Sequence, residues 1–142
     1  MPIKIPLFKA KTLGFERDMV TFSVKYDTFM VITAAIVDTG CPFTILSEKS
    51  VKRSRIPYQN KDDENIVLLG NIQLKLKKLG SCSLLLKDEN NNPVKFEQEV
   101  SVGIPMLKGY LAQDLPSFLG KDFLNNHSIT IVNRREGSYL LK

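Results

Sequence analysis

The sequence has few residues of the kinds that build metal centres. Its 142 residues include two cysteines, Cys41 and Cys82, and one histidine, His127. Zinc sites usually draw four ligands from cysteine, histidine and acidic side chains at characteristic spacings, and these residues do not provide such a set. We therefore expect no metal and no cofactor. With no metal-like or evidently paired cysteines, an intracellular, cytoplasmic protein is the default expectation.

Long hydrophobic runs are also missing. The longest apolar stretch, residues 29–37, is interrupted by Thr33 and is far shorter than the roughly 20 residues of a membrane-spanning helix. The amino terminus has two early prolines and no apolar core, so we expect neither a signal peptide nor an anchor. There is no low-complexity tract and no repeat. With 43% hydrophobic and 25% charged residues, the composition is that of a soluble globular protein.

The length of the chain sets the expected domain organisation. A chain of 142 residues is long enough for one domain with a core, and short for two. We therefore expect a single domain over residues 1–142.

The net charge of +5 raises the question of nucleic-acid binding. In residues 72–77 apolar and polar side chains alternate, which places the polar ones on one solvated face of a strand. A second basic cluster, residues 52–55, follows a plausible N-cap at Ser47 and ends before Pro57, which predicts a short surface helix. Because neither cluster has interleaved aromatics, we expect no nucleic-acid partner, and a basic nucleic-acid-binding β-barrel is the weaker alternative.

Strand signals dominate the rest of the chain. Turn-forming residues at 70–71, 88–93 and 133–137 separate apolar runs, a pattern typical of β-hairpins. Helix is expected only at residues 47–55 and about 121–125. The expected class is mostly β, in a closed or partly closed barrel with one or two short helices. The expected strands lie at residues 19–24, 29–37, 66–69, 72–76, 84–86, 94–102, 129–132 and 139–141.

One carboxylate stands out among these strands. Residues 29–37 have the apolar character of a continuously buried strand and lead directly into Asp38-Thr39-Gly40, after which a second apolar run follows. Burying an unpaired charge is strongly unfavourable and is usually tolerated where a site needs it. Asp38 is therefore the candidate catalytic residue. The alternative is a structural role, in which Asp38 caps a turn by accepting backbone amide hydrogen bonds.

Two segments resemble signatures of the aspartic proteases. Residues 36–47, which read Ile-Val-Asp-Thr-Gly-Cys-Pro-Phe-Thr-Ile-Leu-Ser, resemble the active-site loop of that family. Residues 117–124, which read Ser-Phe-Leu-Gly-Lys-Asp-Phe-Leu, resemble the second signature, a hydrophobic pair and a glycine before a short helix. The half-size chain is similar to the single-lobed, retropepsin-like branch (clan AA), in a stand-alone cellular or microbial form. The resemblance implies a single-lobe acid-protease barrel with a core at about residues 20–132 and an N-terminal extension at residues 1–18.

The resemblance also implies a reaction and a partner. Aspartic proteases hydrolyse peptide bonds with a water held between two carboxylates, which share one proton because like charges this close cannot both ionise. This chain supplies one such residue, since Asp27 lacks a following glycine and precedes a strand instead of ending one. The resemblance therefore implies a homodimer in which each chain contributes Asp38 and which acts on an extended peptide or protein substrate. A catalytically silent member of the same fold, which binds peptides or dimerises, is the leading alternative.

Other residues of the two signatures receive roles from the resemblance. The Thr39 hydroxyl would hydrogen-bond across the dimer axis, and Gly40 would leave room for substrate backbone. Thr44 matches a downstream hydroxyl position of the family, and Leu119 and Gly120 would pack behind the catalytic turn. These five residues, with Asp38 and Cys41, make up the expected active-site region.

A hairpin around Leu69, Gly70 and Asn71 is the candidate flap, which would close over a peptide held by strand addition. Its glycine content is lower than in viral enzymes, which implies a stiffer flap. The cleft that it covers is expected to be mostly apolar and to favour bulky hydrophobic residues at the cleaved bond.

The chain also departs from the family pattern. Cys41 stands where the family usually has alanine, serine or threonine, and a thiol is a poorer hydrogen-bond donor than a hydroxyl, which implies slower or acid-shifted activity. Pro42 and Lys121 stand where retroviral members often carry an ion pair, so we expect the carboxy-terminal hairpin to help hold the dimer. We expect Asp122 to start a helix and not to be catalytic. A thiol mechanism with Cys41 and His127 is a further, weaker alternative.

Overall fold

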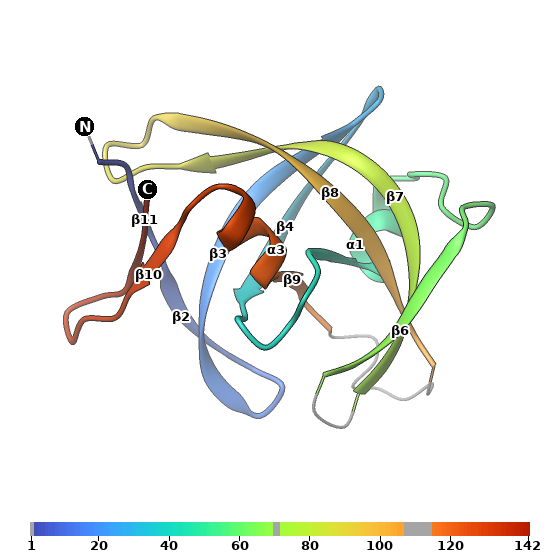
Figure 1. Cartoon of the computed structure of the whole chain (residues 1–142), viewed down its shortest axis with the longest axis horizontal. Helices are drawn as coiled ribbons and strands as arrows, with labels where there is room; N and C mark the ends of the chain where they lie inside the picture. Colours follow the sequence, from blue (N-terminus) through green and yellow to red (C-terminus); the bar gives the residue numbers. More distant parts are fainter. Residues whose placement is uncertain (1, 70–71, 107–114) are drawn as a thin grey trace.

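The computed structural model describes residues 2–69, 72–106 and 115–142, and it is built mainly from strands, as predicted (Figure 1). The described elements are β1 (Lys4–Pro6), β2 (Phe8–Thr12), β3 (Phe15–Tyr26), β4 (Phe29–Val37), β5 (Ile45–Ser47), α1 (Glu48–Arg53), β6 (Asp63–Leu69), β7 (Ile72–Lys87), β8 (Pro93–Pro105), β9 (Ser117–Leu119), α3 (Lys121–Asn126), β10 (Thr130–Val132) and β11 (Tyr139–Leu141). The expected mostly β class is therefore confirmed.

The larger sheet closes on itself. Its strands follow the order β2-β3-β4-β9-β5-β8-β7-β6, and β3 also pairs with β7. This second pairing closes β3, β4, β9, β5, β8 and β7 into a barrel. Strands β2 and β6 lie outside the closed ring (Figure 1). Closure removes most free strand edges, and it agrees with the barrel expected from the sequence.

Strand β7 is longer than the sequence pattern indicated. The apolar runs at residues 72–76 and 84–86 were expected as two strands, but β7 passes through both and pairs with β8 along almost its whole length. A register shift between Lys78 and Gly80, where Gly80 has a φ of +112°, lets the strand bend without ending. Apolar periodicity marks the two buried parts of β7 and not the bend that joins them.

The strand that leads to Asp38 has the expected bounds but not the expected burial. Val31, Thr33 and Ala35 point into the protein, whereas Met30 and Ile32 are 57% and 62% exposed. The first part of β4 therefore has one solvent-facing side, whereas Ile36, further along the same face, is buried in a second apolar cluster. The prediction of a continuously buried strand was wrong.

Both short helices form where the sequence placed them. Ser47 caps α1, because its hydroxyl oxygen accepts a hydrogen bond from the backbone N–H of Ser50 at 3.2 Å. Helix α3 begins directly after Gly120, so it starts at the second signature. No helix in the described ranges is long and apolar enough to cross a membrane.

The two ends of the chain meet in a smaller sheet. Strands β10 and β11 form the expected carboxy-terminal hairpin, and β1 pairs with the other side of β11, so the order is β1-β11-β10. Strand β2 pairs with β3. The N-terminal extension therefore pairs with its own chain (Figure 1).

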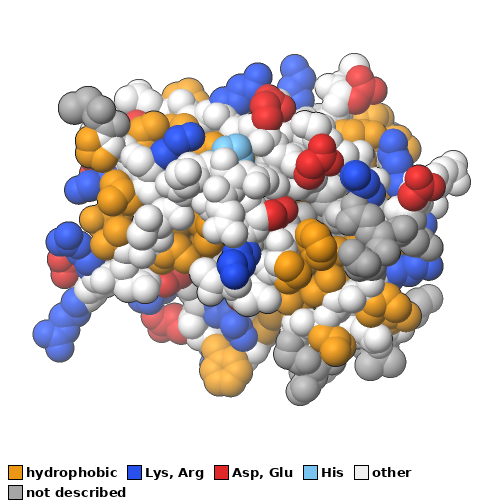
Figure 2. All heavy atoms as spheres, in the orientation of Figure 1, with side chains coloured by type: hydrophobic (Ala, Val, Ile, Leu, Met, Phe, Trp, Pro, Cys, Tyr) orange, Lys and Arg blue, Asp and Glu red, His pale blue; other side chains and the backbone are white. Residues whose placement is uncertain are grey.

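The buried apolar side chains form two clusters. The first fills the barrel and includes Phe22, Leu84 and Phe123. The second lies beside the Asp38 turn and brings together residues of β4, β5, β7 and β9. On the face shown in Figure 2, Lys and Arg side chains are dispersed among acidic ones and form no single basic patch.

Candidate active site

Asp38 lies at the end of β4 in a tight turn. Its backbone N–H donates to the carbonyl oxygen of Leu119 at 3.1 Å, which ties the start of the turn to β9. Its Oδ1 accepts a hydrogen bond from the Gly40 N–H at 2.8 Å, and its carbonyl oxygen accepts one from the Cys41 N–H at 3.2 Å. The carboxylate is half-buried, while Thr39 and Gly40 are exposed. One carboxylate oxygen is thus fixed by the turn, and Oδ2 has no hydrogen bond within the described residues.

The two signatures lie side by side although they are far apart in sequence. Strands β4 and β9 are parallel neighbours, with Val37 opposite Leu119. The N–H of Lys121 donates to the carbonyl oxygen of Cys41 at 2.8 Å. A Cβ atom on Gly120 would lie 2.2 Å from the carbonyl oxygen of Phe43, so only glycine allows this approach. The structure therefore places Leu119 and Gly120 directly against the Asp38 turn.

A polar network supports the turn from behind. The Thr44 hydroxyl donates to Asp122 Oδ1 at 2.8 Å and accepts a hydrogen bond from the Gly120 N–H at 3.3 Å. Asp122 also accepts from the Phe123 N–H at 2.7 Å and from Gln98 Nε2 at 3.0 Å. Asp122 lies at the start of α3, as expected. The contacts of Asp122 with Thr44 and Gln98 were not expected, because no local motif in β8 marks Gln98 as a partner.

We expect Asp122→Ala to destabilise the protein by about 2 kcal/mol, because three donors lose the acceptor that they share. Chemical unfolding of the variant and the wild type measures this loss. Glu136→Ala, which removes an exposed carboxylate from the loop between β10 and β11, is the control and should change the free energy of unfolding little. Equal losses of unfolding free energy in the two variants would contradict a role of Asp122 in stabilising the turn.

The thiol of Cys41 is buried within the turn. Its Sγ donates to the carbonyl oxygen of Phe43 at 3.1 Å. Burial raises the pKa of the thiol to about 11, and the nearby Asp38 and Asp122 carboxylates add to the rise. His127 contacts Gln98, Phe96 and Phe123 and has no described contact with Cys41. The structure therefore does not bring together the thiol and imidazole of the alternative mechanism.

The buried thiols predict a loss of stability in alkali. Burial also raises the pKa of Cys82 to about 12, and both groups have an ordinary value of 9.0. A thiol whose pKa is higher in the folded protein favours unfolding as the pH rises, because the unfolded chain then releases its proton. We expect the free energy of unfolding to fall from pH 9 towards pH 11.

Urea unfolding across this pH range measures the effect. A Cys41→Ala/Cys82→Ala variant should lose less stability over the same interval, because it has no thiol to ionise. An identical pH dependence in the variant would contradict the assignment to the two cysteines.

Asp38 and Thr39 line a hollow of about 360 Å³. The other walls come from β3, from the end of β4 and from the two ends of the chain, and they are Leu7, Asp18, Val37, Ile131 and Asn133. Asp18 is therefore the acidic residue that shares a hollow with Asp38, and sequence reasoning, which considered Asp27, missed it. The register of β3 against β4, which pairs Met19 with Ile36, brings Asp18 to this hollow, and no pattern in the sequence gives that register. Asp18 is engaged by Lys9, with 3.0 Å between Nζ and Oδ1.

A buried apolar cluster adjoins the Asp38 turn. Cys41 shares the second apolar cluster with Ile36 and Phe118, which follow the same parallel pairing of β4 and β9. The β6–β7 hairpin adds Val67 and Leu74 to this cluster. The hairpin therefore folds towards the Asp38 turn.

The end of this hairpin is the candidate flap. Leu69 pairs with Ile72 and packs against the same cluster, whereas Gly70 and Asn71 lie outside the described residues. The opposite face of β6 exposes Ile66 and Leu68, and hydrophobic side chains gather in this region of Figure 2.

Comparisons with known proteins identify the fold. No protein-family model matches the chain, and a search of curated proteins finds no match. Among solved structures, a retropepsin-like aspartic protease from Rickettsia conorii matches with a TM-score of 0.53 and 14% identity, over 99% of this chain and 89% of that one. The chain therefore has the single-lobe retropepsin-like fold.

Two further structures resemble the chain less closely. The EIAV protease in complex with the inhibitor HBY-793 has a TM-score of 0.49 and 14% identity, and the match covers 87% of this chain and all of that one (100%). The retroviral protease-like domain of Ddi1 from Leishmania major has a TM-score of 0.42 and 12% identity, over 87% and 94% of the two chains.

Proposed function

We propose that this chain is an aspartic endopeptidase that acts as a homodimer, with Asp38 of each subunit forming the catalytic pair. The observation that carries the proposal is the environment of Asp38. A retropepsin-like barrel presents this half-buried carboxylate in an exposed turn, with Oδ1 held by the Gly40 N–H and the turn fixed from behind by Gly120.

The pair would work by moving two protons. The ionised carboxylate accepts a proton from water while the water oxygen attacks the scissile carbonyl carbon, and the protonated carboxyl donates to the carbonyl oxygen. When the C–N bond breaks, the nitrogen takes a proton from the carboxyl that received one from water. The hydroxyl of the intermediate returns its proton to the carboxylate that had donated one to the carbonyl oxygen, so the pair again shares one proton.

The second carboxylate has to come from another chain, because neither acidic candidate within the chain is suitable. Asp27 precedes β4 and Asp38 follows it, so the nine residues of the strand separate them by about 30 Å. Asp18 lines the same hollow, but its Oδ1 lies 3.0 Å from Lys9 Nζ, so this carboxylate is already engaged within its own chain. A twofold axis through the Thr39 and Gly40 face of the turn would instead bring two Asp38 side chains together.

The hollow and the terminal sheet supply the dimer contact in this proposal. Leu7 and Ile131 line the hollow beside Thr39, so a partner turn would meet both apolar and polar groups there. Strand β11 is paired on both sides within its own chain, which leaves β1 and β10 as the outer strands of the terminal sheet. The partner would therefore join through β1 or through β10, which belongs to the carboxy-terminal hairpin.

The substrate would lie between the turn and the β6–β7 hairpin. An extended peptide can pair with strand backbone there, and the apolar side chains of the second cluster favour bulky hydrophobic residues next to the cleaved bond. Because Val67 and Leu74 are buried against that cluster, substrate entry requires the hairpin to lift.

Cleavage of a denatured protein tests the proposal. We expect peptide products at acidic to neutral pH, inhibition by pepstatin, and a specific activity that falls on dilution as the dimer dissociates. A protein that remains dimeric in sedimentation experiments and cleaves no substrate at any pH would contradict the endopeptidase and support the catalytically silent alternative.

A further inference from the structure

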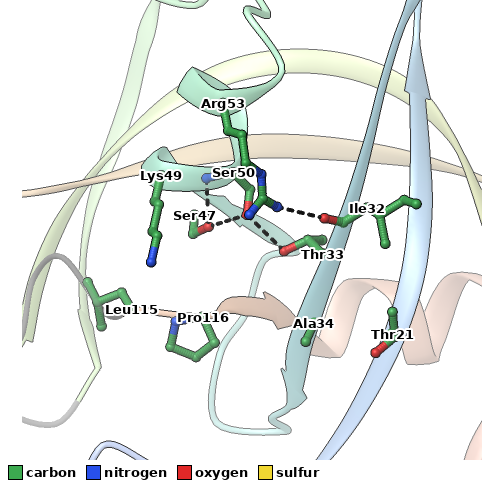
Figure 3. Close-up of a pocket in the computed structure, with 10 residues that line it drawn as sticks. All are labelled: Thr21, Ile32, Thr33, Ala34, Ser47, Lys49, Ser50, Arg53, Leu115 and Pro116. Atoms are coloured by element: carbon green, nitrogen blue, oxygen red, sulfur yellow. Dashed lines mark hydrogen bonds between the residues drawn. The ribbon is translucent and has the colours of Figure 1, made fainter.

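A second pocket lies away from Asp38, beside the middle of β4 and the residues that lead into β9. It has a volume of about 290 Å³ and is formed where α1 faces β4 and the start of β9 (Figure 3). Its polar lining consists of hydroxyl groups and two cations, and no acidic side chain contributes to it among the described residues. The basic cluster of α1, to which the proposed protease mechanism gives no role, borders this pocket.

Four buried hydroxyl groups lie at the base of this pocket or directly behind it. The Ser47 hydroxyl donates to Ser50 Oγ at 2.8 Å. Thr33 Oγ1 lies 3.1 Å from Ser50 Oγ and 2.8 Å from Ser117 Oγ. Each contact uses one hydroxyl proton, so these three contacts leave one of the four protons without a hydroxyl acceptor.

The direction of the hydrogen-bond chain decides where the remaining proton lies. When Ser117 donates to Thr33 and Thr33 donates to Ser50, the remaining proton belongs to Ser50, which lines the pocket. Ser117 Oγ already accepts a hydrogen bond from the Ser47 N–H at 3.0 Å, which is compatible with this direction. A hydrogen-bond acceptor bound in the pocket would favour this direction of the chain, because the Ser50 hydroxyl could then donate to it.

Two cations flank the hydroxyls. Arg53 Nη2 donates to the carbonyl oxygen of Ile32 at 3.1 Å, which holds the guanidinium over the pocket (Figure 3). Its other N–H donors, and the ammonium of Lys49, have no hydrogen bond or ion pair within the described part of the chain. The pocket therefore combines two positive charges with a hydroxyl donor, and no acidic side chain lines it among the residues that the structure describes.

We propose that this pocket binds a phosphate group, either as inorganic phosphate or as a small phosphate monoester. A phosphate dianion matches the two charges of Lys49 and Arg53, and its oxygens can accept from the guanidinium and from Ser50 at the same time. A volume of about 290 Å³ exceeds that of a phosphate ion and leaves room for the group that carries the ester. This site is separate from Asp38 and does not depend on proteolysis.

Titration followed by amide NMR at constant ionic strength tests the site. We expect saturable shifts at residues 33, 47–53 and 116–117 with inorganic phosphate or O-phosphoserine. Tighter binding of one probe would identify which source of phosphate the pocket prefers. Acetate at the same concentration should not saturate the same signals, and equal binding of acetate would overturn the assignment to phosphate.

Variants of α1 separate the pocket from general surface charge. Arg53→Gln should weaken phosphate binding about tenfold, because it removes a charge and several donors, and Ser50→Ala should weaken it by a smaller factor. Lys52→Gln is the matched control, since it removes one charge from the same helix but alters a side chain that faces Glu48, 3.9 Å away, and does not line the pocket. Shifts that do not saturate, or equal weakening in Lys52→Gln and Arg53→Gln, would overturn the proposal.

Discussion

Asp38→Asn is expected to lower the rate of peptide hydrolysis by about 1,000-fold or more, because an amide can neither accept the proton of water nor share a proton with its counterpart. In a homodimer the substitution removes both carboxylates of the pair. The fold should survive, since the Asp38 side chain makes one described hydrogen bond, and the amide oxygen can still accept it from the Gly40 N–H. Initial rates on a denatured protein, with circular dichroism of both proteins, measure the effect.

Asp18→Asn is the matched control for this prediction. It neutralises the other carboxylate of the same hollow and breaks the ion pair with Lys9, but it leaves the proposed pair intact. Activity should stay within a few-fold of the wild type, because an exposed ion pair contributes little to stability. Equal losses in the two variants, with both proteins still dimeric in sedimentation experiments, would show that Asp18 and Asp38 of one chain act together, which would contradict the proposed homodimeric pair.

Gly120→Ala is expected to destabilise the protein by about 3 kcal/mol and to lower the midpoint of thermal unfolding by about 10 °C. The added Cβ would lie 2.2 Å from Phe43 O, 2.4 Å from Phe43 C and 2.9 Å from Cys41 O. All three are backbone atoms, so no side chain can rotate to make room. The backbone of Gly120 has an ordinary φ of −90°, and the cost is therefore steric.

Gly40→Ala provides the comparison within the same turn. Its Cβ would meet Asp38 Oδ1 at 3.1 Å, a side-chain atom that can shift slightly. We expect a loss of less than about 1 kcal/mol in the free energy of unfolding. Equal midpoints for Gly120→Ala and the wild type would contradict the close contact between the second signature and the turn.

The elements that the sequence predicted correctly are those whose signal is local. Strand β4, the carboxy-terminal hairpin and helix α1 follow from apolar runs, turn residues and the Ser47 cap, each within a few residues of chain. The resemblance to two signatures added what local patterns lack, namely that residues 117–124 belong beside residues 36–47. The parallel pairing of β4 and β9 places them together.

Features that depend on contacts between distant strands could not be predicted. Gln98 reaches Asp122 only because β8 passes α3, and Thr33 meets Ser117 only because β4 and β9 are neighbours. A period of two tells which residues share a strand face but not which strands lie opposite that face. The same limit explains the exposed side of β4 and the hollow that Asp18 shares with Asp38.

Mixing the wild-type chain with Asp38→Asn chains tests the shared catalytic pair most directly. With nine variant chains for each wild-type chain and free exchange of subunits, activity per wild-type chain should fall to about a tenth, because most wild-type chains then pair with a variant. Unchanged activity per wild-type chain under the same conditions would mean that one chain holds a complete site, and would contradict the homodimeric mechanism.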